Sequence, residues 1–297
     1  MQLSGSICAL ITPFTADGSL DLDGFSRLLE RQLAGGTTGV VVAGSTGEAA
    51  MLERDEFVAL LECAVDRIGG RIPVLAGTGT AGTAKTVAQT RLAAASGADA
   101  ALVVTPYYVR PTQEGLYRHF IAVAEEGDLP IVLYNVPSRT GCDLEPATVA
   151  RLCGHPRVVG VKEAHAAPER MQSLVPMQGT QFAVLSGDDA TMARAQLAGA
   201  AGVISVAANV AAGAVQAVCA ACAAGDVARA RGLDAKLAAL YAFLGVESNP
   251  IPVKWLASEL HGDIGAHLRL PLTPLSTHHH AAGRALADQL RSDPELF

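Results

Sequence analysis

The chain has 297 residues, of which 50% are hydrophobic and 17% charged, and its formal net charge is −7. This composition supplies a large core and excludes a predominantly disordered chain. The acidic balance and the 4% of aromatic residues exclude a nucleic-acid surface built from phosphate contacts and stacked bases.

Short apolar runs that predict β-strands recur along the chain, with helical patterns between them. The runs cover 6–11, 39–43, 73–76, 101–105, 130–134, 158–161, 182–185 and 202–206, and helical patterns include 23–34, 54–68, 83–96, 112–126 and 189–198. Strands that are apolar at nearly every position and joined by helices imply a parallel sheet covered on its outside. Eight such units predict a closed (β/α)8 barrel, the TIM-barrel fold.

We expect the barrel to occupy residues 1–225 and a C-terminal helical extension to occupy residues 226–297. Helical patterns in the extension cover 226–244, 252–260 and 277–290, and Ser276 is expected to cap the last of them.

The stretch 195–225 carries no charge and is long enough to cross a bilayer, but alanine dominates it and glycines interrupt it. We therefore expect a buried helix, strand and helix there, and no membrane partner. The first residues show no basic stretch followed by an apolar region, so we expect no signal peptide and a cytoplasmic protein.

Lys162 lies at the end of the sixth apolar run, where active-site residues of such barrels are found. Apolar neighbours disfavour the charged form of a lysine, and a neutral amine can attack a ketone to form a Schiff base. A strand-end lysine whose ammonium reaches solvent is the alternative.

Two further features support carbonyl chemistry. Tyr134 ends the fifth run, and its hydroxyl can relay protons, although a tyrosine there can also serve packing alone. The segment Gly44-Ser-Thr-Gly-Glu48 lies between strand and helix, so its N–H groups and hydroxyls can bind a carboxylate or merely cap the helix. Together with Lys162, these features favour a small 2-oxo acid as substrate.

Competing chemistries are less well supported. The segment Gly77-Thr-Gly-Thr-Ala-Gly82 matches a dinucleotide fingerprint, but the next strand ends at Thr105 where an acidic residue is needed, so we favour a glycine-rich turn at the barrel mouth.

Of the histidines only His165 follows a strand end, and Asp188 and Asp189 are better explained as a helix cap than as metal ligands. We expect neither a cofactor nor a metal.

The six scattered cysteines indicate reduced thiols, because a large core needs no disulfides. Cys219 and Cys222 have the spacing of a redox or zinc motif. They lie in an alanine-rich helical stretch without a second pair, so packing is the preferred interpretation.

Motifs from Ser6 to about Ser276 closely resemble the dihydrodipicolinate synthase (4-hydroxy-tetrahydrodipicolinate synthase) family. They are Gly44-Ser-Thr-Gly-Glu48, Val104-Thr-Pro-Tyr-Tyr108, Tyr134-Asn-Val-Pro-Ser-Arg-Thr-Gly141, Gly160-Val-Lys-Glu163, Leu185-Ser-Gly-Asp-Asp189, Gly202-Val-Ile-Ser205 and Asn249-Pro-Ile-Pro-Val-Lys254. The resemblance implies a class I aldolase barrel that condenses pyruvate with L-aspartate 4-semialdehyde on the route to diaminopimelate and lysine.

The resemblance also implies roles for individual residues. Lys162 would form the imine with pyruvate, and Tyr134 would donate and accept protons. Ser45 and Thr46 would bind the pyruvate carboxylate, with Gly187 and Ile204 adding backbone or packing contacts.

A second group of implied roles concerns the mouth and the neighbouring subunit. Tyr108 would reach into the site of a neighbouring copy and complete a relay with Tyr134 and Ser45, in a homotetramer built as a dimer of dimers. Arg139 would meet the carboxylate of the semialdehyde, a task suited to a planar bidentate cation.

Three departures from the family pattern are visible. Ser45 replaces the usual threonine, which keeps the hydroxyl but frees its rotamer. His165 and Ala166 stand where relatives often carry a small hydroxyl residue and glycine, which leaves the acceptor substrate open. Lysine-inhibited relatives hold lysine with Asn, Glu and two His residues at positions matched here by Ala81, Lys85, Arg54 and Phe57, so we expect no inhibition by lysine.

Rival functions remain from three classes. A sister aldolase, such as N-acetylneuraminate lyase or a 2-keto-3-deoxy-sugar-acid aldolase, would share the lysine and tyrosine, although Arg139 and the Tyr107-Tyr108 pair favour the first assignment. A nicotinamide oxidoreductase would bind NAD(P)H at the glycine-rich turn. A non-catalytic binder would form no covalent adduct.

Overall fold

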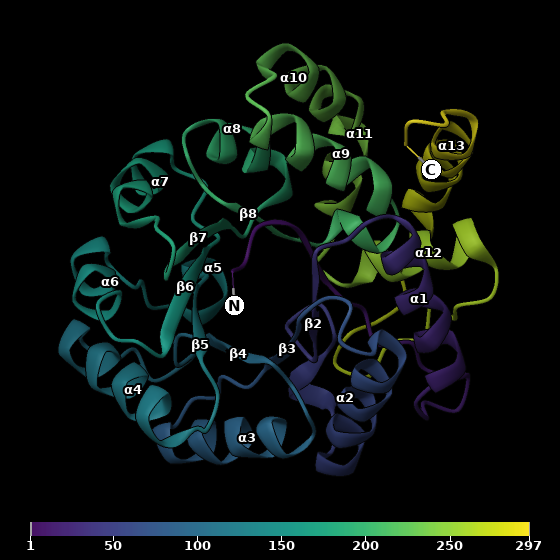
Figure 1. The fold of residues 1–297 in the computed structure, drawn as a ribbon. Coiled ribbons are helices and arrows are strands. Elements are labelled where there is room, and N and C mark those ends of the chain that lie inside the picture. The colour runs from purple at the N-terminus through teal and green to yellow at the C-terminus, as the bar shows by residue number, and fades with distance from the viewer. Residues whose placement is uncertain (1, 297) are drawn as a thin grey trace.

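A computed structural model describes residues 2–296. Within them, eight parallel strands close into a barrel in sequence order, the first pairing with the last (Figure 1). The strands are β1 (Gly5–Ala9), β2 (Gly39–Val42), β3 (Val74–Gly77), β4 (Ala100–Val104), β5 (Ile131–Asn135), β6 (Val158–Glu163), β7 (Ala183–Ser186) and β8 (Gly202–Ser205). The predicted barrel is therefore confirmed.

Helices surround the barrel on its outside, as Figure 1 shows from one end. They are α1 (Leu22–Ala34), α2 (Arg54–Ile68), α3 (Thr83–Ala95), α4 (Gln113–Glu126), α6 (Pro146–Leu152), α7 (Pro168–Leu174), α8 (Met192–Leu197) and α9 (Ala212–Ala223). The short α5 (Pro137–Thr140) directly follows β5 and lies within the ring of helices in Figure 1. Local sequence signals start several of them. Asp21 accepts a hydrogen bond from the backbone N–H of Gly24 at 2.7 Å, and Thr112 caps α4 in the same way.

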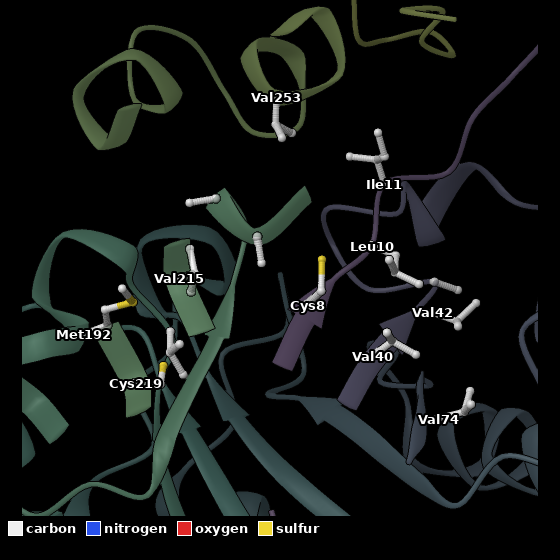
Figure 2. Close-up of a cluster of buried hydrophobic side chains, with 14 of the residues drawn as sticks. Cys8, Leu10, Ile11, Val40, Val42, Val74, Met192, Val215, Cys219 and Val253 are labelled. Atoms are coloured by element: carbon white, nitrogen blue, oxygen red, sulfur yellow. The ribbon is translucent and has the colours of Figure 1, made fainter. Parts of the chain in front are cut away.

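The alternation of side chains along each strand separates two cores. Tyr134, Leu185 and Ile204 belong to the cluster inside the barrel, which Leu3 joins from the N-terminus. Cys8 and Val40 belong to the larger cluster between strands and helices, part of which Figure 2 shows.

The C-terminal segment adds four helices within the described residues: α10 (Val227–Lys236), α11 (Ala238–Leu244), α12 (Ile251–His261) and α13 (His280–Ser292). The single helix expected at 226–244 is interrupted at Leu237, whose N–H bonds to the carbonyl of Asp234 three residues back and tightens the turn. The division of the chain at residue 225 stays a prediction.

Ser276 does not cap the last helix as expected. A 3-10 turn (Thr277–His279) precedes α13, His279 takes the capping position, and the backbone N–H of Ser276 donates to Glu247 at 3.2 Å.

The uncharged stretch 195–225 forms the end of α8, then β8 and α9, as predicted. In the part of the chain that the structure describes, no helix has the length and apolarity needed to span a membrane.

Candidate active site

Lys162 and Tyr134 lie side by side at the ends of neighbouring strands. They are register partners in the pairing of β5 with β6, and the Lys162 Nζ lies 4.3 Å from the centroid of the Tyr134 ring. Lys162 is 5% exposed and Tyr134 is 7% exposed. The predicted burial of this lysine is confirmed, and a side chain that reaches solvent is excluded.

Two predicted neighbours shape the space around Lys162. A Cβ on Gly187 would lie 3.0 Å from the Lys162 Cγ and 2.9 Å from the Ala164 Cβ, so only glycine leaves room for the lysine side chain. Ile204 is 1% exposed and lies in the same interior cluster as Tyr134. Gly187 therefore leaves space for the lysine side chain, and Ile204 packs in the interior cluster that contains Tyr134.

The predicted carboxylate-binding loop presents its two hydroxyl residues differently. Thr46 is buried, and its Oγ1 accepts a hydrogen bond from the Asn249 Nδ2 at 2.9 Å. Ser45 is exposed in the single chain. The carbonyl of Gly47 accepts from the Thr12 hydroxyl at 2.7 Å, which fastens the loop to the segment after β1.

Glu48 ends this loop in a fully buried ion pair. Its Oε1 lies 2.6 Å from the Lys254 Nζ with both side chains at 0% exposure, and its Oε2 accepts from the backbone N–H of Arg269 at 3.1 Å. Burial lowers the pKa of Lys254 to about 8. Glu48 also has a left-handed backbone with φ at +56°, a conformation that is uncommon for a residue with a Cβ. The pair with the C-terminal segment therefore holds the loop in a demanding geometry.

Asn249 links two parts of the mouth. Its side chain binds Thr46, and its carbonyl accepts from the Arg139 guanidinium at 3.1 Å. Its buried Oδ1 has no hydrogen-bond partner among residues 2–296. Sequence reasoning gave Asn249 and Lys254 no role, although their motif was part of the family resemblance.

Tyr108 lies apart from this buried group. Its side chain is 90% exposed, and its backbone has a φ of +73°. Arg110 is also left-handed, with φ at +46°, and Tyr107 and Val109 are exposed at 40% and 55%. The structure of one chain therefore does not bring Tyr108 together with Lys162.

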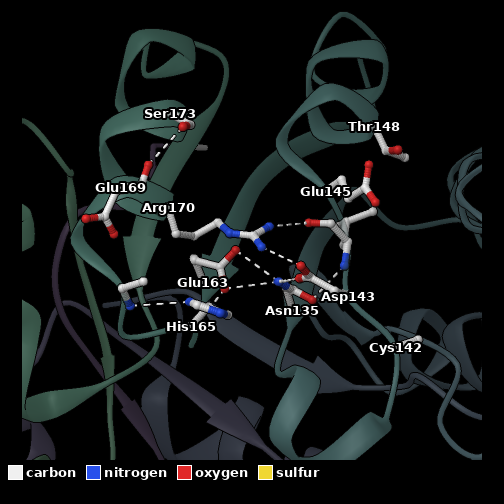
Figure 3. Close-up of polar contacts among 12 residues, drawn as sticks. Asn135, Cys142, Asp143, Glu145, Thr148, Glu163, His165, Glu169, Arg170 and Ser173 are labelled. Atoms are coloured by element: carbon white, nitrogen blue, oxygen red, sulfur yellow. Dashed lines mark hydrogen bonds and ion pairs between the residues drawn. The ribbon is translucent and has the colours of Figure 1, made fainter.

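On the outer face of the same strands, Asn135 and Glu163 form a second pair one residue beyond Tyr134 and Lys162 (Figure 3). They are 0% and 1% exposed, and the Asn135 Nδ2 lies 3.1 Å and 3.0 Å from the two carboxylate oxygens of Glu163. Burial raises the pKa of Glu163 to about 7. Both residues belong to motifs of the family resemblance, and sequence reasoning assigned neither of them a function.

Asp189 does not cap the helix that follows it, contrary to expectation. Its carboxylate accepts from the Ser205 hydroxyl at 2.5 Å and from the N–H groups of Val206 and Ala207 at 3.0 Å and 2.9 Å. The backbone N–H groups of Val206 and Ala207, in the turn after β8, need an acceptor, and the Asp189 carboxylate supplies it. Asp189 therefore ties two strand ends together.

The glycine-rich turn after β3 is explained by crowding between strands. A Cβ on Gly77 would lie 2.1 Å from the Ala43 carbonyl oxygen, and one on Gly79 would lie 2.4 Å from the backbone nitrogen of Val104. These glycines let the ends of β2 and β4 approach β3, which accounts for the pattern without a dinucleotide.

The arrangement combines a buried amine, a phenol against it and a loop with free hydroxyl and N–H groups. Such a set can form and hydrolyse an imine with a carbonyl compound and move the protons that these steps require.

Comparisons with known proteins agree on one group. The sequence model of the Dihydrodipicolinate synthetase family matches residues 2–290. A 4-hydroxy-tetrahydrodipicolinate synthase from Xanthomonas axonopodis pv. citri (strain 306) is 58% identical over 293 residues, covering 99% of this chain and 95% of the relative.

Solved structures match over the same length. The chloride-inhibited dihydrodipicolinate synthase from Acinetobacter baumannii, crystallised with pyruvate, is 43% identical with a TM-score of 0.94, covering 97% of this chain and 99% of that chain. A monomeric dihydrodipicolinate synthase variant is 40% identical with a TM-score of 0.94, covering 97% and 96%.

Proposed function

The chain belongs to the dihydrodipicolinate synthetase family, and on that premise we propose that it condenses pyruvate with L-aspartate 4-semialdehyde through a Schiff base on Lys162. The observation that carries the proposal is the buried Lys162 amine, 4.3 Å from the centre of the Tyr134 ring. The product, 4-hydroxy-tetrahydrodipicolinate, would enter the diaminopimelate and lysine route.

The chemistry begins when the Lys162 nitrogen attacks the ketone carbon of pyruvate. Proton transfers to the resulting carbinolamine release water and leave an iminium, and loss of a methyl proton gives an enamine. The enamine carbon then forms a bond to the aldehyde carbon of the second substrate, whose oxygen takes up a proton. The amino group of that substrate would next attack the iminium carbon and displace the Lys162 nitrogen, which closes the ring and frees the lysine. Tyr134 would carry the protons of these steps, because a phenol can donate and accept a proton and this residue is the register partner of Lys162 on the neighbouring strand.

Substrate carboxylates would be held at two places. Ser45 and Thr46 would bind that of pyruvate, and Arg139 would bind that of the semialdehyde. Gly187 and Ile204 would shape the space around the imine, which fits the close approach of Gly187 to the Lys162 side chain.

We also propose that a second copy completes the site. An exposed tyrosine held in a left-handed turn, as Tyr108 is, is suited to reach into a neighbouring chain, where it would join the relay of Tyr134 and Ser45. The assembly would be a homotetramer made of two tight dimers. Since one similar protein is a monomeric variant, the assembly needs its own test.

Two further proposals follow from the family assignment. The cytoplasm would be the site of this biosynthetic reaction, and lysine would not inhibit it. The sister aldolases considered from the sequence gain no support, because the similar proteins carry the dihydrodipicolinate synthase name.

Trapping of the imine tests the reaction directly. The protein is incubated with pyruvate, reduced with borohydride and digested, and the adduct is mapped by mass spectrometry. The chain has four lysines, so the assignment is unambiguous. We expect the adduct on Lys162 alone, with none in Lys162→Arg and an unchanged yield in the control Lys85→Arg.

An adduct on Lys85, Lys236 or Lys254, or no adduct, would contradict the mechanism. Turnover with aspartate semialdehyde, compared with sugar-acid aldehydes, then identifies the acceptor. Faster turnover of a sugar-acid aldehyde would favour a sister aldolase.

A further inference from the structure

Asn135 and Glu163 stand directly behind the reacting pair. Tyr134 and Lys162 point into the barrel, and the next residue of each strand points outward into the layer under α6 and α7 (Figure 3). Each pair sits at one register position of the β5 and β6 ladder. A displacement of one strand end against the other would therefore shift both pairs together.

Both N–H groups and the oxygen of the Asn135 side chain take part in hydrogen bonds. Its Nδ2 donates to both oxygens of Glu163 and, at 2.7 Å, to the Asp143 Oδ1. Its Oδ1 accepts from the backbone N–H of Leu144 at 2.9 Å. One amide thus joins the end of β5, the end of β6 and the loop between α5 and α6.

Within the described part of the chain, only one of the two carboxylates in this network, that of Asp143, has a cation as its direct partner. Asp143 has Arg170 of α7 as its ion-pair partner, whereas Glu163 receives hydrogen bonds from neutral donors, namely Asn135 and the backbone N–H of His165 at 2.7 Å. A buried carboxylate without its own cation favours the protonated form. This accounts for the raised pKa of Glu163, which the more distant Arg170 only partly offsets and Asp143 reinforces.

A small cavity gives this carboxyl group a route to protons. It has a volume of about 60 Å³ and is lined by Glu163, His165, Thr191, Arg194 and Gln172, together with apolar residues of α7, α8 and the segments next to them. That volume can hold a water molecule beside polar groups. The Arg194 guanidinium donates to the Ala166 carbonyl at 2.9 Å, so its charge faces the same cavity wall.

We propose that Asn135 and Glu163 are positioning residues that lock the ends of β5 and β6 together and so hold the Tyr134 ring against the Lys162 amine. The inference rests on the proposed function and deepens it. Ionised Glu163 accepts from the Asn135 amide with both oxygens. Protonated Glu163 turns an O–H toward an N–H donor, which weakens the lock. The site is therefore better ordered above the pH at which Glu163 ionises.

The test compares Glu163→Gln with the wild-type protein. Glutamine keeps the shape of the side chain and cannot titrate. We measure the rate of borohydride-trapped adduct formation from pH 5.5 to 9, together with kcat and the KM for pyruvate. We expect kcat to fall roughly 10- to 100-fold, the scale of a misplaced reacting group, with little change in KM.

The ratio of wild-type to variant trapping rates carries the pH information, because the other pH-dependent steps of imine formation affect both proteins alike. We expect this ratio to rise between pH 6 and pH 8. Glu169→Gln is the matched control, because Glu169 is an exposed acid on the adjacent α7. It should leave the rate and its pH profile unchanged. Asn135→Ala removes the amide that donates to Glu163, so its kcat, KM and pH profile should resemble those of Glu163→Gln.

Wild-type rates and pH profiles in both variants would overturn the inference while leaving the Schiff base intact. If the variants fail to fold, the wild-type protein still decides: the carboxyl of Glu163 is followed by ¹³C NMR, and a trapping rate whose pH profile has no inflection where Glu163 titrates overturns the proposal. A wild-type protein that forms no adduct on Lys162 overturns the proposed function and this role with it.

Discussion

Glu163 makes a pH-dependent contribution to the free energy of unfolding. Its pKa is raised to about 7 from an ordinary value of 4.5, so the folded state favours the protonated form. The contribution is fully present below pH 4.5 and is lost as the pH rises through 7. We expect the free energy of unfolding to fall by about 3 kcal/mol more in the wild-type protein than in Glu163→Gln between pH 5 and pH 8. Urea unfolding at both pH values measures this, and an equal decline in the two proteins would contradict it.

Ser45 offers a second test at a single position. Removing its hydroxyl in Ser45→Ala should lower kcat by roughly 100-fold if the group takes part in proton transfer, since positioned acids and bases contribute about 10² to 10⁴. Ser45→Thr restricts the rotamer and keeps the hydroxyl, so it should retain or raise the wild-type kcat. The kcat values of Ser45→Ala and Ser45→Thr, measured by steady-state kinetics, distinguish the effect of the hydroxyl from that of its rotamer. Near-normal turnover of Ser45→Ala would rule out a relay role.

The sequence predicted the inward-facing residues of the candidate site better than the residues that hold them and the neighbouring loop in place. Lys162 and Tyr134 could be found because barrels expose their strand ends at one mouth, so a lone amine after an apolar run is conspicuous. Asn249 and Lys254 could not be placed, because their partners Thr46 and Glu48 lie about 200 residues away in the sequence. Only the folded chain brings these segments together.

At the scale of elements, α12 and Asn249, which lies two residues before it, hold the predicted carboxylate-binding loop in place. The Lys254 ammonium meets Glu48 in a pair that is fully removed from solvent. Breaking such a pair by deleting one partner leaves an uncompensated buried charge.

Lys254→Met should therefore reduce the free energy of unfolding by about 3 to 5 kcal/mol and raise the KM for pyruvate. The double variant Glu48→Gln with Lys254→Met should recover part of this stability because no lone charge remains. Lys236→Met removes an exposed ion pair and should leave the denaturation midpoint nearly unchanged. A loss in the double variant as large as in Lys254→Met would contradict the interpretation.

The order of strands and helices could be predicted because apolar runs and helical periodicity are local signals. The details that were wrong depend on neighbours. The interruption at Leu237 occurs where that side chain is fully buried, and the last helix begins at His280 because Ser276 turns toward Glu247. Packing partners decide such boundaries, and the sequence does not name them.

For the whole molecule, subunit mixing tests whether Tyr108 serves a neighbouring chain. Tyr108→Phe and Lys162→Ala should each be strongly impaired alone. In a hybrid dimer, the Lys162→Ala chain supplies an intact Tyr108 to the site of the Tyr108→Phe chain. Refolding the two together should therefore restore part of the activity, measured as the initial rate.

Tyr107→Phe serves as the control for the neighbouring phenol and should keep more activity than Tyr108→Phe. If each chain used its own Tyr108, mixing would restore nothing. Light scattering of the wild-type protein reports the tetramer expected from the same proposal.

Lysine sensitivity is the remaining property of the assembly. The positions matched to lysine ligands carry Lys85 and Arg54, both exposed cations, and Phe57, which is 3% exposed within the core under α2. Cations repel the lysine ammonium, and a buried ring cannot bind it. Initial rates should therefore stay unchanged at millimolar lysine, and inhibition below that concentration would contradict the expectation.

Leu3 fills the end of the barrel interior that lies opposite the C-terminal ends of the strands. It is 3% exposed and packs into the cluster inside the barrel. With that end filled, both proposed substrates would reach Lys162 from the C-terminal ends of the strands. A molecule bound to the lysine would then have to enter before one bound nearer the opening, so we expect an ordered binding sequence.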